Sequence, residues 1–143
     1  MAFHLRKSAG KQTATFKATE ISVDAENPIE LEVRHAGLGN DAFMSAIATP
    51  ADDKESGRER DARLLAKSIV VAWKNVLEDG EVRECTPDNV LRFFLEWIAP
   101  KHDGEADVDY HRRVAEFDRL TTFAYSAATF RAPIAPAETL GKG

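Results

Sequence analysis

The densest group of metal-capable side chains lies in residues 102–111, whose sequence is HDGEADVDYH. Its two imidazoles and four carboxylates are groups that can hold a divalent ion. A metal-dependent hydrolase built on His102 and His111 is therefore one function to weigh. The spacing matches neither a helical His-x-x-x-His pair nor a calcium-binding loop. We favour a solvated acidic loop whose aspartates cap the next helix, and we expect no metal and no other cofactor.

Two further patterns could carry chemistry. Cys85 is the only cysteine, and it lies beside a helix start at Thr86–Asp88, where the helix dipole would lower the pKa of a thiol. No histidine is close in sequence and two nearby glutamates oppose this effect, so we interpret Cys85 as passive. Residues 37–39, Gly-Leu-Gly, lack the third glycine or the lysine of a phosphate-binding loop and predict a turn. We therefore predict no catalytic residues and a protein that is not an enzyme.

A group of large aromatic residues suggests recognition instead of catalysis. Aromatic side chains at helical spacing usually belong to a core, and full burial of each is worth about 1.5–3 kcal/mol. Two adjacent phenylalanines and a tryptophan cannot all point to one centre in a small domain, however, and such side chains dominate interfaces. We therefore predict a partner-binding surface formed by Trp73, Phe93, Phe94, Trp97 and Phe130.

Length and composition limit the class of protein. The 143 residues are 43% apolar and 30% charged, which is typical of one soluble globular domain. The longest unbroken apolar run, residues 69–73, is too short to cross a bilayer, so we expect no membrane partner. The N-terminus lacks the apolar region of a secretory signal, and a single cysteine excludes an internal disulfide. These features predict a cytoplasmic protein.

The net charge of −5 is unevenly distributed. Residues 1–19 contain four cations and no acid, which leaves the remaining chain near −9 by subtraction. An acidic body argues against binding along a nucleic-acid backbone, so we expect no nucleic-acid partner. We divide the chain into a flexible basic arm at 1–14, a single helical domain with an N-terminal hairpin at 15–131, and a flexible C-terminal tail at 132–143.

Alternation near the N-terminus predicts a β-hairpin. Residues 16–24 mix β-branched residues with partial alternation, and residues 29–34 alternate strictly, which places Ile29, Leu31 and Val33 on one face. The turn between them contains Asp, Asn and Pro. An isolated hairpin is marginal in water, so its apolar face must cover helices or pair with another chain.

The remaining chain favours helices. A short helix is expected after Asn40 or Asp41, and a second over residues 61–73, after a charged segment at 49–60 that is either a loop or a frayed helix start. Residues 68–71 taken alone would also suit a strand. The Asp79-Gly80 pair predicts a tight turn between extended arms.

Two longer helices complete the prediction. Thr86 and Pro87 mark the start of one that closes at Pro100, and a last helix spans residues 109–131 after a hydrophilic linker. We therefore predict a mainly α fold with a small N-terminal β-hairpin, an α+β arrangement in a compact helical domain.

The order of these signals resembles a known family, the tail assembly chaperones of long-tailed, siphophage-type bacteriophages. The resemblance covers roughly residues 29–131 and is a pattern match instead of a strict signature. Its matching pieces are Gly39–Phe43, the Val-Val-Ala-Trp run ending at Trp73, the Asp79-Gly80 turn, the Thr86–Asn89 helix start, Pro100 and the segment Phe123–Phe130. The linkers at 49–60 and 101–109 depart from the family pattern.

The resemblance implies a non-enzymatic protein of the host cytoplasm. Members of this family bind and solubilise the tape measure protein, help to recruit tail tube protein, tend to self-associate and use no cofactor. The family often makes a longer second product by ribosomal frameshifting, and the Leu140-Gly-Lys-Gly143 end could be encoded by a slippery run. An alternative function is a structural virion protein, such as a minor tail protein or a tail or head completion protein.

Overall fold

The computed structural model describes residues 13–22, 24–37, 39–50 and 53–130. The predicted basic arm, except for its last two residues, and the predicted C-terminal tail lie outside these residues. The order of elements is β1 (Thr13–Ala18), β2 (Ile29–Arg34), α1 (Asp41–Ile47), α2 (Gly57–Ser68), β3 (Val70–Lys74), β4 (Leu77–Glu78), β5 (Glu81–Val82), α3 (Pro87–Trp97), α4 (Asp107–Tyr125) and a short 3-10 helix, η2 (Ala127–Phe130).

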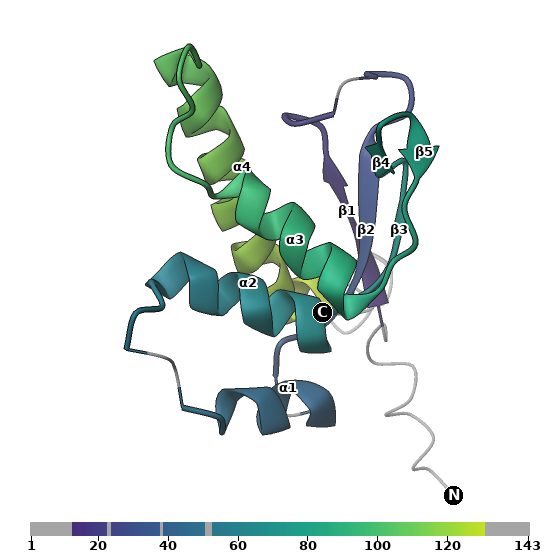
Figure 1. The fold of residues 1–143 in the computed structure, drawn as a ribbon. Coiled ribbons are helices and arrows are strands. Elements are labelled where there is room, and N and C mark those ends of the chain that lie inside the picture. Colours follow the sequence, from purple (N-terminus) through teal and green to yellow (C-terminus); the bar gives the residue numbers. More distant parts are fainter. Residues whose placement is uncertain (1–12, 23, 38, 51–52, 131–143) are drawn as a thin grey trace, which may run out of the picture.

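The predicted hairpin is confirmed in its second strand, residues 29–34, whereas its first strand is Thr13–Ala18 instead of residues 16–24. The two strands form the start of a larger sheet. β1 and β2 pair antiparallel from Thr13 opposite Arg34 to Ala18 opposite Ile29. Leu31 and Val33 are fully buried, as their alternation predicts. Figure 1 shows helices α2, α3 and α4 together on one side of this sheet, so the strands and helices form two layers with the core between them.

The prediction of a mainly helical fold with a single hairpin is wrong. Residues 70–74, expected at the end of a helix over 61–73, form β3 and pair antiparallel with β2, which makes a three-stranded sheet in the order β1-β2-β3. The described residues contain four α-helices and five strands in two antiparallel sheets, a mixed α+β fold. Val70 and Val71 favour a strand because they are β-branched, and β2 offers an edge for them to pair with.

The helix boundaries also differ from the predicted ones. The charged segment at 49–60 contains the start of α2, where Ser56 and Glu59 form a reciprocal capping box. α4 ends at Tyr125 instead of residue 131, because Ser126 is extended before η2 begins. The aspartates before α4 do not cap it: its first flanking residue is Ala106, and Asp107 and Asp109 lie in the first turn, where they complement the helix dipole.

A buried carboxylate connects α4 to the sheet. Glu116 is 1% exposed and accepts a hydrogen bond of 2.9 Å from the backbone N–H of Glu20, in the turn that follows β1. Arg119, one helical turn further along α4, donates to the same carboxylate. A buried charge without partners is costly, so these two donors are what permit Glu116 to lie in the core.

A second buried polar group joins three elements at one point. Asn40 is 3% exposed, and its side-chain oxygen accepts from the N–H of Phe43, which caps α1. Its amide nitrogen donates to the carbonyl of His35 beyond β2 and, over 2.8 Å, to the carbonyl of Ser68 at the end of α2. The backbone N–H of Arg34 also donates a hydrogen bond of 2.8 Å to the carbonyl of Ile69. The end of α2 is thereby held against the end of β2.

We predict that Asn40→Ala lowers the free energy of unfolding by about 2–4 kcal/mol, because it removes a helix cap worth about 0.5–2 kcal/mol and leaves buried carbonyls unsatisfied. Urea denaturation measures this loss. Thr86→Ala is the matched control, because the Thr86 hydroxyl oxygen only caps α3, accepting from the N–H of Asn89. It should cost about 1 kcal/mol. Equal losses for the two variants would contradict the joining role of Asn40.

Candidate functional site

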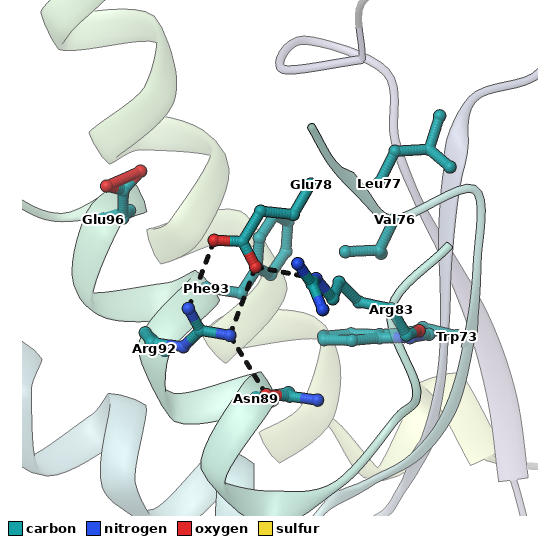
Figure 2. Close-up of a pocket in the computed structure, with 9 residues that line it drawn as sticks. All are labelled: Trp73, Val76, Leu77, Glu78, Arg83, Asn89, Arg92, Phe93 and Glu96. Carbon is teal, nitrogen blue, oxygen red and sulfur yellow. Dashed lines mark hydrogen bonds and ion pairs between the residues drawn. The ribbon is translucent and has the colours of Figure 1, made fainter. Parts of the chain in front are cut away.

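A partly open groove lies between α3 and the segment that runs from β3 through the β4–β5 hairpin. Its volume is about 240 Å³. Pockets for drug-sized ligands usually measure about 300–1,000 Å³, so this one can hold one or two side chains of a partner. Nine residues line it: Trp73, Val76, Leu77, Glu78, Arg83, Asn89, Arg92, Phe93 and Glu96 (Figure 2).

Local sequence positions the hairpin wall of the groove. Asp79 and Gly80 both have positive φ, 54° and 80°, which is the two-residue turn that the Asp-Gly pair predicts. The register then places Leu77 opposite Val82 and Glu78 opposite Glu81. Because neighbouring residues of a strand point to opposite faces, the turn fixes which side chains face α3. Figure 2 shows Glu78 directed toward α3 and Leu77 directed away from it.

Two aromatic side chains form the floor of the groove. Trp73, from β3, and Phe93, from α3, meet edge to face with ring centroids 5.6 Å apart. The Trp73 indole N–H donates a hydrogen bond of 2.7 Å to the carbonyl of Arg83, which follows β5. Arg83 in turn donates its backbone N–H to the carbonyl of Val76. The indole therefore fastens the hairpin over the end of β3.

The polar rim is organised by one carboxylate. The Glu78 carboxylate accepts hydrogen bonds of 3.2 and 3.3 Å from the two terminal nitrogens of Arg92. Arg92 also donates a hydrogen bond to the side-chain oxygen of Asn89. The Arg83 Nε lies 2.7 Å from the same carboxylate, an ion pair by distance that lacks hydrogen-bond geometry. These side chains are about 40–60% exposed, so their ion pairs add little stability and serve mainly to orient the two arginines.

The structure separates the five predicted partner-binding residues into two groups. Trp73 and Phe93 are half-buried and line the groove. Phe94, Trp97 and Phe130 are at most 5% exposed and belong to the core, where Phe94 and Trp97 both contact Phe117. The surface available to a partner is therefore the part of the aromatic cluster around Trp73 and Phe93.

Two surface residues beside the groove were not among the predicted site residues. Leu77 and Val82 are 54% and 77% exposed. Their pairing across the Asp79-Gly80 turn gave a signal in the sequence, because a two-residue turn sets residues 77 and 82 opposite each other. Leu77 lines the groove, and Val82 lies opposite it on β5 as a second exposed apolar side chain.

The segment at 102–111, which contains two histidines, is organised by Arg113. Glu105 receives two hydrogen bonds of 2.9 Å from Arg113 and one of 3.1 Å from the backbone N–H of His102. Arg113 also donates to the carbonyls of Trp97 and Pro100, so the pair closes the connection between α3 and α4. No group of three or more metal-capable side chains occurs within the described residues.

The two other patterns with possible chemistry have plain structural roles. Cys85 is half-buried, and this burial raises the pKa of its thiol, opposite to what a reactive cysteine requires. Gly37 and Gly39 lie in the connection between β2 and α1. The Asn40 N–H donates to the Gly37 carbonyl, as in a tight turn.

Comparisons of the chain with protein-family models, with curated proteins and with solved structures give no match. Among the described residues, no helix combines the length and the apolar character needed to span a membrane. A function is therefore inferred from the residues and geometry of the chain itself.

We predict that Trp73→Phe loosens the hairpin, because the aromatic contact with Phe93 is kept while the Arg83 carbonyl loses its donor. The free energy of unfolding should fall by about 1 kcal/mol. Hydrogen exchange at the Arg83 amide should accelerate, because its bond to Val76 opens more often. Val71→Thr, an exposed position on the same strand, is the control and should leave that exchange rate unchanged. An unchanged rate in Trp73→Phe would contradict the fastening role of the indole.

A second prediction concerns acid stability. The Arg113 guanidinium, with the N–H of His102, lowers the pKa of Glu105 from 4.5 to about 2. The ionised carboxylate therefore stabilises the fold at pH values above its pKa in the unfolded chain. This stabilisation is lost as the pH falls through its lower pKa in the folded protein. The difference in urea midpoint between the wild type and Glu105→Gln should be constant above about pH 5 and shrink toward pH 2. A difference that persists unchanged at pH 2 would contradict this assignment.

Proposed function

We propose that this protein is a tail assembly chaperone of a long-tailed bacteriophage, acting in the host cytoplasm by binding and solubilising the tape measure protein. One observation supports the proposal most directly. The residues that carry the family resemblance between Val70 and Pro100 are the residues that build the groove: the strand ending at Trp73, the Asp79-Gly80 turn and the helix that starts at Thr86-Pro87.

The proposed mechanism is masking of apolar surface. A long tape measure protein exposes apolar helical stretches until the tail tube surrounds it, and the groove offers a complementary apolar surface around Trp73, Phe93 and Leu77. An exposed apolar patch with a charged rim usually marks a partner site. The net charge of −5 favours solubility of the loaded complex. Recruitment of tail tube protein and self-association complete the proposed role.

The test is a co-expression experiment with the tape measure protein of the same phage. The chaperone role predicts that the full chain keeps the tape measure protein in the soluble fraction and co-purifies with it. Mass spectrometry of purified virions is the second measurement, and a chaperone should be absent from them. Failure to bind or solubilise the tape measure protein would contradict the proposal. Stoichiometric presence in virions would favour the alternative, a structural virion protein.

A further inference from the structure

The groove lies beside an exposed apolar pair on the hairpin. Leu77, which lines the groove, lies opposite Val82 on β5, so their side chains share one face of the two-stranded ribbon. Both are more than half exposed, at 54% and 77%. Val82 is not one of the lining residues, and the Leu77 side chain is directed away from α3 (Figure 2). The apolar lining is therefore Trp73 and Phe93 at the floor with Leu77 at the edge, and we call this site the hairpin groove.

The rim of the hairpin groove is acidic. Four exposed carboxylates lie next to its lining residues or across from them on the hairpin, and none has an ion-pair partner among the residues that the structure describes: Asp79, Glu81, Glu84 and Asp88. A fifth, Glu96, lines the groove itself and is exposed.

The cations of this region are fewer than its carboxylates: Arg83, Arg92 and Lys74 stand against Glu78, Glu96 and the four rim carboxylates. Arg83 and Arg92 share the carboxylate of Glu78. Lys74 lies opposite Glu30 in the pairing of β2 with β3, and its charge contributes to the lowered pKa of Glu32. The field around the groove is therefore negative, which favours a positively charged partner and opposes an acidic one.

We propose that the hairpin groove binds the apolar face of a basic amphipathic helix from a partner protein. One or two apolar side chains of the helix enter the cavity above Trp73 and Phe93, and its Lys or Arg side chains meet the acidic rim. A helix satisfies its own backbone hydrogen bonds, so side-chain contacts alone are enough to hold it in a groove. The proposal rests on the proposed function in that the tape measure protein would supply this helix.

Two fluorescent probe peptides test the chemistry without the tape measure protein. One has leucines at helical spacing with Lys and Ala elsewhere, and the other replaces every Lys by Glu. We expect the Lys peptide to bind the full chain at least about tenfold more tightly, with an affinity that falls as salt is added. The chain has two tryptophans, so NMR gives two indole N–H signals. The Trp73 signal should shift on binding, and the signal of Trp97, which lies in the core behind Phe93, should shift less.

Matched variants locate the binding site. Leu77→Gln removes an apolar side chain without changing the charge and should raise the dissociation constant of the Lys peptide about tenfold. Val108→Gln makes the same kind of change at a residue that is 59% exposed on α4, and it should change the constant less than about twofold. The double change Glu81→Gln with Glu84→Gln should weaken binding and reduce its salt dependence, whereas Glu26→Gln with Asp103→Asn should do neither.

The outcomes separate this proposal from the proposed function. Equal affinity for the two peptides, or equal effects of Leu77→Gln and Val108→Gln, would overturn the hairpin groove as a site for basic helices. If the tape measure protein binds equally well to the wild type and to Leu77→Gln, the chaperone role stands and the groove proposal fails. If the Lys peptide binds as expected and the tape measure protein does not, the groove proposal stands and the chaperone role fails.

Discussion

The carbonyls of Ser68 and Ile69 receive hydrogen bonds from the Asn40 side chain and the Arg34 backbone, and the rest of the structure depends on this junction. It lies where α2 ends and β3 begins, with Ile69 alone between them. Because the junction is bonded to the end of β2, the chain must leave α2 along the free edge of that strand. The position of β3 then fixes Trp73, and Trp73 fixes the hairpin through the Arg83 carbonyl.

α3 forms the opposite wall of the groove, and hydrogen bonds fix it at both of its ends. Thr86 caps its first turn, and Arg113 donates to the carbonyls of Trp97 and Pro100 at its end. The aromatic residues on the inner side of α3 pack against α4, where Phe94 contacts Phe117. Phe93 is left at the boundary between core and surface. The groove thus results from the way α3 packs on the core, which leaves Phe93 accessible to a partner.

Local signals predicted the parts of the fold that depend on neighbouring residues. The strict alternation of residues 29–34, the Asp79-Gly80 turn and the Thr86 cap are set by short-range chemistry and appear as expected. β3 was missed because residues 64, 65, 69 and 73 fit one helical face, whereas residues 68–71 alone would also suit a strand. The choice is made by pairing with β2, far away in sequence. For the same reason, only Trp73 and Phe93 of the five predicted site residues line the groove. Which of Phe93, Phe94 and Trp97 faces the core depends on the position of α4, which no local pattern contains.

The strand order also has a consequence for the route by which the chain folds. β1 and β2 are joined by a short connection, whereas β3 reaches β2 only after α1 and α2 have been traversed. Closing that longer loop carries an entropic cost, and prior formation of α2 reduces it because a helix shortens the distance the free chain must span. We therefore expect β3 to dock after the hairpin and α2 have formed. A nascent chain would hold the β2 edge unpaired until residue 74 has emerged, which is the interval in which pairing with another strand competes with correct folding.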